Sequence, residues 1–183
     1  TASYYYPSSH SANHEVAIVG WDENYAAANF SPAAPGNGAF LVRNSWGTSW
    51  GQSGYFYISY YDATIAELTS FNNAEPTSNY SGAYSYDPLG WVTSWGYGVS
   101  QAWGANLFSA TSNEPIAAVG FVTTDKNTQY IVNVYTGVTA GDPVSGTLAA
   151  SKSGTMANPG YYTLALDSPV AVTAGSRFSV VIK

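Results

Sequence analysis

Short apolar runs separated by turn residues dominate the pattern of this chain, and no long helical periodicity is present. Three runs in the first third, at 14–20, 38–44 and 55–61, are rich in β-branched and aromatic residues and predict strands. The first run contains four consecutive apolar residues, 16–19, and predicts a buried strand. The stretch between the first two runs, 22–37, is rich in Ala, Pro and Gly, which predicts a surface loop with room for one helical turn.

The second half of the chain contains strand candidates at regular spacing, each bounded by turn residues. They lie at 105–110, 116–124, 129–136, 146–152, 160–167 and 177–183. Strands at this spacing predict a β-sandwich or jelly-roll-like domain. Two of them alternate clearly, and this alternation predicts that one set of side chains faces the core. The expected core-facing residues are Tyr162, Leu164, Leu166, Phe178, Val180 and Ile182.

These patterns divide the chain into a first region at 1–62, a connector at 63–83 and a second region at 84–183. The connector could begin as one more strand before it becomes irregular. The chain starts at Thr1 and stops at Lys183, inside a predicted strand. We therefore expect a fragment or a processed piece, whose second domain could be truncated at its C-terminus.

Composition narrows the class of protein. Charged residues make up 9% of the chain and aromatic residues 16%, while 45% of residues are hydrophobic, which is enough to bury a core. The net charge of −6, with five Lys and Arg residues, argues against a nucleic-acid partner. No apolar run is long enough to predict a membrane span. The absence of cysteine excludes disulfides and thiolate-held metals within this sequence.

Two motifs carry candidate chemistry. Asn13 and His14 precede the first predicted strand, which ends in Val-Gly-Trp, and Asn44 follows the second strand within Asn-Ser-Trp-Gly. A thiol protease requires an imidazole beside its thiol, so that the pair exists as thiolate and imidazolium. An acceptor must orient the other ring nitrogen, and an asparagine oxygen can do so. The sequence therefore holds two thirds of such a triad and lacks the cysteine.

These motifs resemble the C-terminal half of papain-family cysteine proteases, over about 50 residues. The resemblance implies a partial papain-fold β-barrel in the first region, with His14 as the general base and Asn44 as its orienting residue. Trp46 would cover their hydrogen bond on the leaving-group side, and Asn13 and Glu15 would frame the cleft. In this family the cysteine lies roughly 130–150 residues before the histidine, which places it upstream of Thr1.

The second region resembles the lectin-like β domain that follows the protease in bacterial secreted members. The similar stretches are 86–91, 102–106, 118–121 and 175–181. The long insertion at 22–37 also resembles an insertion found in those bacterial secreted members. The resemblance implies a mainly β, secreted or cell-surface protein of bacterial or archaeal origin.

Other residues have simpler interpretations. His10 is expected to be a solvated loop residue, and Glu15, Asp22 and Glu23 a solvated acidic loop rather than a metal site, because no further ligands occur at metal-binding spacing. We expect no metal and no cofactor. The aromatic residues between 84 and 103 could form a sugar-stacking platform, although such residues more often fill a core or an interface. They are Tyr84, Tyr86, Trp91, Trp95, Tyr97 and Trp103.

Three functional hypotheses follow. The chain could be the C-terminal part of a papain-like cysteine endopeptidase, partnered by a missing N-terminal half that carries the cysteine and acting on a protein or peptide substrate. Alternatively, it could be a cell-surface, glycan- or protein-binding module with an inactive peptidase-like region. Third, the missing half could carry another residue in place of the cysteine. In each case we expect these residues alone to lack protease activity and the first region to expose an apolar face.

Overall fold

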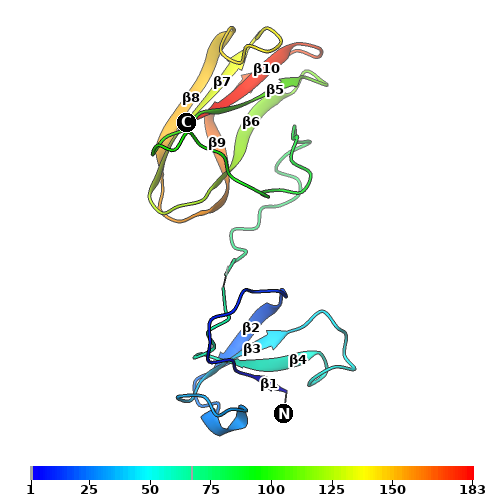
Figure 1. Cartoon of the computed structure of the whole chain (residues 1–183). Coiled ribbons are helices and arrows are strands. Elements are labelled where there is room, and N and C mark those ends of the chain that lie inside the picture. The colour runs from blue at the N-terminus through cyan, green and yellow to red at the C-terminus, as the bar shows by residue number, and fades with distance from the viewer. Residues whose placement is uncertain (1, 67) are drawn as a thin grey trace. The chain divides into compact units, whose positions relative to one another are not determined.

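The computed structural model describes residues 2–66 and 68–183, which form two compact units, Thr1–Ala74 and Glu75–Lys183 (Figure 1). The boundary between them lies inside the predicted connector at 63–83. That connector contains no strand among its described residues, so the predicted additional strand is wrong. Its start is instead a turn, in which Asp62 accepts hydrogen bonds from the backbone N–H of Thr64 at 2.8 Å and of Tyr6 at 2.7 Å.

The first unit contains a four-stranded sheet in the order β1-β4-β3-β2. Its strands are β1 (Ser3–Tyr4), β2 (Ala17–Asp22), β3 (Ala39–Arg43) and β4 (Tyr55–Ser59). β1 pairs with β4 in parallel, and the other pairs are antiparallel. The three longer strands fall within the predicted runs. The sheet is open, with β1 and β2 at its edges, so the described residues of the expected partial barrel form no closed barrel.

Aromatic packing holds the loop at 22–37 against this sheet. Tyr25 and Phe30 are buried, and Tyr25 stacks on Tyr57 of β4 with ring centroids 4.1 Å apart. The predicted helical turn is present as a short 3-10 helix at Ala27–Asn29. The Asn37 side chain accepts a hydrogen bond from the backbone N–H of Ala27 at 3.0 Å, which ties the two ends of the loop together.

The burial predicted for the strand at 14–20 is wrong. Val19 is 52% exposed and Trp21 is 70% exposed, and Val16 and Ile18 are also exposed. β2 lies at the edge of the sheet, and among the described residues of the first unit β3 is the one strand that pairs with it. An uninterrupted apolar run indicates a strand that is suited to burial, but the run cannot indicate what covers it.

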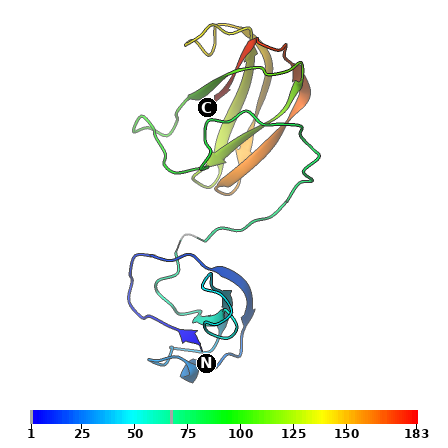
Figure 2. The same cartoon turned by 90° about the vertical axis from the view of Figure 1, so that its right-hand side faces the viewer.

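The second unit is a β-sandwich, seen in both views (Figure 1 and Figure 2). One sheet has the order β5-β10-β7-β8 and the other pairs β6 with β9. The strands are β5 (Gly104–Ser109), β6 (Pro115–Thr123), β7 (Thr128–Thr136), β8 (Thr147–Met156), β9 (Gly160–Ala171) and β10 (Arg177–Ile182). Each of the six overlaps a strand predicted from the sequence.

The core of the sandwich lies between these two sheets. Val132 and Val134 of β7 are fully buried and pack with Val119 and Phe121 of β6 and Leu166 of β9. The predicted core-facing alternation in β9 and β10 is confirmed, because Leu164, Val180 and Ile182 pack against this cluster and Phe178 is 1% exposed. Burying this apolar surface is the main favourable contribution to folding of the unit.

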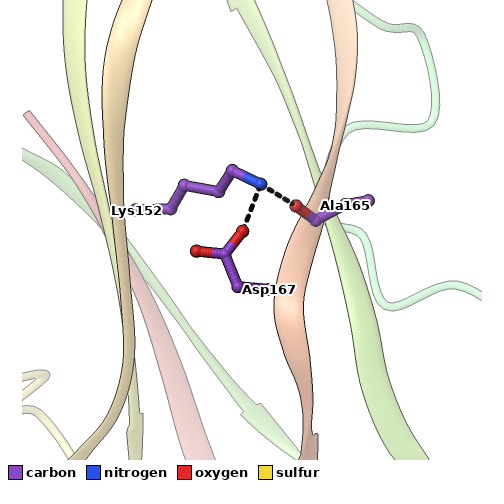
Figure 3. Close-up of polar contacts among 3 residues, drawn as sticks. All are labelled: Lys152, Ala165 and Asp167. Atoms are coloured by element: carbon purple, nitrogen blue, oxygen red, sulfur yellow. Dashed lines mark hydrogen bonds and ion pairs between the residues drawn. The ribbon is translucent and has the colours of Figure 1, made fainter.

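One ion pair connects the two sheets at their β8 and β9 edge (Figure 3). The ammonium group of Lys152 lies 2.6 Å from the carboxylate of Asp167 and donates a hydrogen bond to the carbonyl of Ala165 at 2.9 Å. Lys152 belongs to the four-stranded sheet and its two partners belong to β9. No helix within the described residues has the length and apolar character needed to cross a membrane.

Candidate active site

The pairing of β2 with β3 brings His14 and Asn44 together. Ala17, at the start of β2, pairs with Arg43, at the end of β3. His14 lies three residues before Ala17, and Asn44 directly follows Arg43. Because the strands are antiparallel, both side chains lie at the same end of the sheet, although 30 positions separate them in sequence.

A hydrogen bond of 2.8 Å joins Nε2 of His14 to Oδ1 of Asn44. The same oxygen accepts a hydrogen bond from the backbone N–H of Ser45, also at 2.8 Å. A backbone N–H can only donate, so the Asn44 atom that faces both groups must be the amide oxygen. The His14 nitrogen opposite it must then carry a proton.

This bond fixes the tautomer of the imidazole. A neutral His14 with its proton on Nε2 has a lone pair on Nδ1, which makes Nδ1 the basic atom. Within the described residues no hydrogen bond to Nδ1 is found. His14 is exposed, whereas Asn44 is 7% exposed and its backbone N–H donates to Gly54 at 2.9 Å. The buried Asn44 side chain, whose oxygen accepts two hydrogen bonds, therefore orients the imidazole of His14. The basic nitrogen of that imidazole, Nδ1, accepts no hydrogen bond from the described residues.

Three aromatic side chains support the imidazole. The ring of Trp46 lies 5.0 Å from that of His14, centroid to centroid, and is tilted by 35°. Trp50 meets Trp46 edge-on at 5.1 Å, and Trp50 in turn meets Phe56 of β4 at 5.3 Å. Trp46 itself is 57% exposed, so this edge-to-face series is what restrains it. Phe56 was not a predicted site residue, and its place in a strand pattern gave no sign of this contact.

A groove of about 600 Å³ lies beside the pair, on the side of Asn44. Glu15, Arg43, Thr48 and Tyr55 line it, and His14 and Trp46 do not. Arg43 pairs with Tyr55 in the sheet, and this shared row forms the floor of the groove. Glu15 and Arg43 place one negative and one positive charge in a lining that is mainly apolar.

The remaining predicted residues lie apart from the imidazole contact. Asn13 is exposed next to His14, and His10 is exposed with its Nδ1 2.8 Å from the carbonyl oxygen of Ser11. Asp22 accepts a hydrogen bond from the backbone N–H of Asn24 at 2.9 Å. Desolvation, followed by the nearby Glu23 carboxylate, raises the pKa of Tyr60 above its usual value. Within residues 2–66 and 68–183 no three potential metal ligands lie together.

The aromatic residues at 84–103 have different roles. Tyr84 meets Phe178 edge-on at 5.1 Å and packs against the core, whereas Tyr86 stacks on Phe108 at 5.0 Å and is 62% exposed. Trp95 is 91% exposed. Trp103 is half-exposed and borders a second groove, in the second unit. Tyr84 and Tyr86 thus have packing contacts within the second unit, and a sugar-stacking platform of the six aromatic residues stays a prediction.

The first unit therefore presents an oriented imidazole on an open sheet, and the second unit is a β-sandwich. Comparison with known proteins gives the families. The model of the papain family of cysteine proteases matches residues 2–73, and the model of the lectin-like domain matches residues 83–183. This chain belongs to the lectin-like domain family, with a papain-family cysteine protease segment ahead of that domain.

Individual relatives agree with this assignment. Cathepsin J of Mus musculus is 36% identical over 75 residues, which cover 38% of this chain and 21% of cathepsin J. The clostridial cysteine protease Cwp84 after propeptide cleavage is 30% identical, with a TM-score of 0.67. That match covers 99% of this chain and 45% of the solved chain.

A second structure contains the cysteine protease and lectin-like domains of Cwp84, described as a surface-layer-associated protein of Clostridium difficile. It is 26% identical, with a TM-score of 0.62, and the match covers 91% of this chain and 37% of that chain. This chain thus spans about a fifth of the length of cathepsin J and less than half of each solved Cwp84 chain.

Proposed function

We propose that this chain supplies the histidine and asparagine of a papain-like cysteine endopeptidase. The nucleophilic cysteine would come from an N-terminal half of the peptidase that is not among these 183 residues. The observation that carries the proposal is the 2.8 Å bond from Nε2 of His14 to Asn44, which leaves Nδ1 as an open base. A base with this orientation has a role in catalysis only when a nucleophile lies beside it.

The proposed reaction begins when the thiol transfers its proton to Nδ1 of His14. The resulting thiolate attacks the carbonyl carbon of the peptide bond. The bond between carbon and nitrogen then breaks as Nδ1–H protonates the leaving amine, which leaves a thioester. Water attacks the thioester and gives its proton to Nδ1, which returns that proton to the departing thiolate. The acid product is released, and thiol and imidazole are regenerated.

Each neighbouring residue has a proposed part in these steps. Asn44 keeps the imidazole plane fixed while Nδ1 gains and loses its proton. Trp46 shields the bond between His14 and Asn44 on the leaving-group side, which strengthens that bond by lowering the local dielectric constant. Asn13 frames the opening of the cleft. We propose that the hydrogen-bond donors that stabilise the oxyanion of the tetrahedral intermediate also come from the N-terminal half.

A His14→Ala substitution in the complete protein tests this mechanism. Loss of the general base should lower kcat/KM on a peptide substrate by about 10²–10⁴-fold. His10→Ala is the matched control, because His10 is the other histidine and lies in an exposed loop. A thiol alkylator should abolish the activity, and the 183-residue chain alone should show no turnover. Full activity in the His14→Ala protein would contradict the proposal.

The same experiment distinguishes the inactive alternative. If the complete protein carries no cysteine opposite His14 and cleaves no peptide, the first unit is a peptidase-like partner without catalysis. The structural contacts of Asn44 and Trp46 would then serve stability alone.

For the second unit we propose a binding role at the cell surface, through contact with glycans or cell-wall material. The observation behind this is the series of large side chains that remain exposed between 86 and 103, since large exposed apolar patches on a protein surface are typical of interaction sites. We further propose that the protein is secreted or held at the cell surface, and the description of Cwp84 as a surface-layer-associated protein supports this. Co-sedimentation of the chain with purified cell walls tests this role, and absence of binding would contradict it.

A further inference from the structure

A groove of about 470 Å³ lies on the outer face of the four-stranded sheet of the second unit. Val132 and Val134 of β7 point to the core, so Asn133 and Tyr135 between and after them lie on the opposite face. Val181 of β10 pairs with Asn133 on one side and with Ala105 of β5 on the other. These three residues, in one row across three strands, form the floor of the groove.

The walls of this groove are Trp103 and Val144, which are 48% and 55% exposed. Both are held in place. The hydroxyl of Ser179, a fully buried residue of β10, donates a hydrogen bond to the carbonyl of Pro143 and so fixes the loop that carries Val144. The ammonium group of Lys183 lies 5.3 Å from the centroid of the Trp103 ring, close enough for a cation–π contact that restrains the indole.

The lining of the groove is neutral but partly polar. None of the residues that line it is charged. The Asn133 amide and the Tyr135 phenol have no hydrogen-bond partner in the described part of the chain, and both side chains are half-buried. An amide can donate and accept, as can a phenol. The groove therefore combines an apolar flat wall with adjacent groups that can bond to hydroxyls.

We propose that this groove binds a neutral pyranose ring of a polysaccharide, and this inference rests on the binding role proposed above for the second unit. The apolar CH face of the sugar would stack on the indole of Trp103, and its hydroxyls would exchange hydrogen bonds with Asn133 and Tyr135. The volume is within the range of small-ligand sites, so the groove accommodates one or a few rings. Its open shape fits a ring within a longer chain.

Other ligand classes fit these observations less well. A nucleic acid would require cationic side chains, but no basic residue lines the groove and the chain has a net charge of −6. A peptide that binds by strand addition would require a free sheet edge. Here the central floor strand, β10, is paired on both sides by β5 and β7, so a ligand that lies over β10 contacts side chains, and the one free edge beside the floor belongs to β5.

Titration of the 183-residue chain with cellotriose, mannotriose and chitotriose, followed by isothermal calorimetry and amide NMR, tests the proposal. We expect at least one trisaccharide to bind weakly, with a Kd on the order of 1 mM, and to shift the resonances of Asn133, Val144 and the Trp103 indole N–H. Trp103→Ala should weaken binding by about tenfold or more, as expected for loss of a stacked ring. Asn133→Ala and Val144→Ser are second variants that leave the core unchanged, and each should weaken binding several-fold.

Trp95→Ala is the matched control, because Trp95 is 91% exposed and lies outside the groove. Binding that survives all three groove variants and is lost in Trp95→Ala would overturn the groove assignment while the binding role of the unit remains. Groove resonances that respond to a peptide and to no trisaccharide would overturn the sugar assignment. Absence of binding to both trisaccharides and cell walls would overturn both proposals.

Discussion

At the scale of single residues, Asn44 links the candidate active site to the fold through three hydrogen bonds. Its side-chain oxygen accepts one bond from His14 and one from the Ser45 backbone, and its own backbone N–H donates to Gly54. One buried residue thus ends β3, orders the following turn and orients the imidazole. The same contacts that would serve catalysis also stabilise the first unit, so a change at Asn44 affects both.

Substitution of Asn44 by alanine is therefore expected to lower the free energy of unfolding of the first unit. The Ser45 N–H and His14 Nε2–H each lose their acceptor, and the loss should be about 1–2 kcal/mol. Hydrogen exchange of the β3 amides measures it. Asn13→Ala, at an exposed position, should change the same quantity by less than about 0.5 kcal/mol. Equal effects of the two substitutions would contradict this role of the Asn44 oxygen.

The contact between His14 and Asn44 was predictable from their motifs, whereas the contacts that support this pair were not. The two motifs around His14 and Asn44 indicated an imidazole and an orienting amide, and the structure joins them at 2.8 Å. The Ser45 N–H that fixes the amide orientation could not be predicted, because a backbone donor has no sequence signature. The support of Trp46 through Trp50 to Phe56 depends on distances between a loop and a strand, which no local pattern contains.

For the secondary-structure elements, apolar runs and turn residues predicted, to within a few residues, nine of the ten strands found in the described part of the chain. β1 (Ser3–Tyr4) was missed because its two residues are ordered by parallel pairing with Tyr57 and Ile58 of β4, a contact distant in sequence. Sheet order was also not predictable, since it depends on which strands pair. The burial of β2 was predicted wrongly for the same reason, because burial depends on which other elements pack against a strand in the folded unit.

The ion pair between β8 and β9 provides a test at this scale (Figure 3). We expect Lys152→Met to destabilise the second unit by less than about 1 kcal/mol, because Asp167 is 77% exposed and solvent screens the pair. The difference from the unmodified chain should shrink in 1 M salt, where the screening length falls to about 3 Å. Thermal unfolding at low and high salt measures it.

Lys126→Met serves as the control for this test, because the backbone of Lys126, rather than its side chain, contacts Asp125. It should leave stability unchanged at both salt concentrations. A loss that is large and independent of salt would show that the Lys152 bond to the Ala165 carbonyl, and not the ion pair, carries the contribution.

Considered as a whole, the molecule has two units with different degrees of completeness. The sandwich has a core enclosed by two sheets, whereas the first unit exposes the apolar side chains of β2. We propose that this face receives the N-terminal half of the peptidase, which also brings the cysteine toward Nδ1 of His14. Completing the apolar surface and completing the active site would then be the same assembly step.

This arrangement predicts that the 183-residue chain associates with itself. β2 is an edge strand with unpaired backbone groups and exposed apolar side chains, which is a template for pairing with a second copy. Trp21 is the most exposed of these side chains, and a buried Trp contributes strongly to an interface. Trp21→Lys should therefore raise the dimer dissociation constant by at least about tenfold, measured by sedimentation equilibrium.

Trp95→Lys is the matched control, because it introduces the same charge at an exposed tryptophan of the second unit. If β2 is the contact, this control leaves the dissociation constant unchanged. If Trp95→Lys raised the dissociation constant and Trp21→Lys left it unchanged, the contact would belong to the second unit. A chain that stays monomeric at high concentration would show that the β2 edge needs no partner. This result would contradict the proposal that the rest of the peptidase packs on this face.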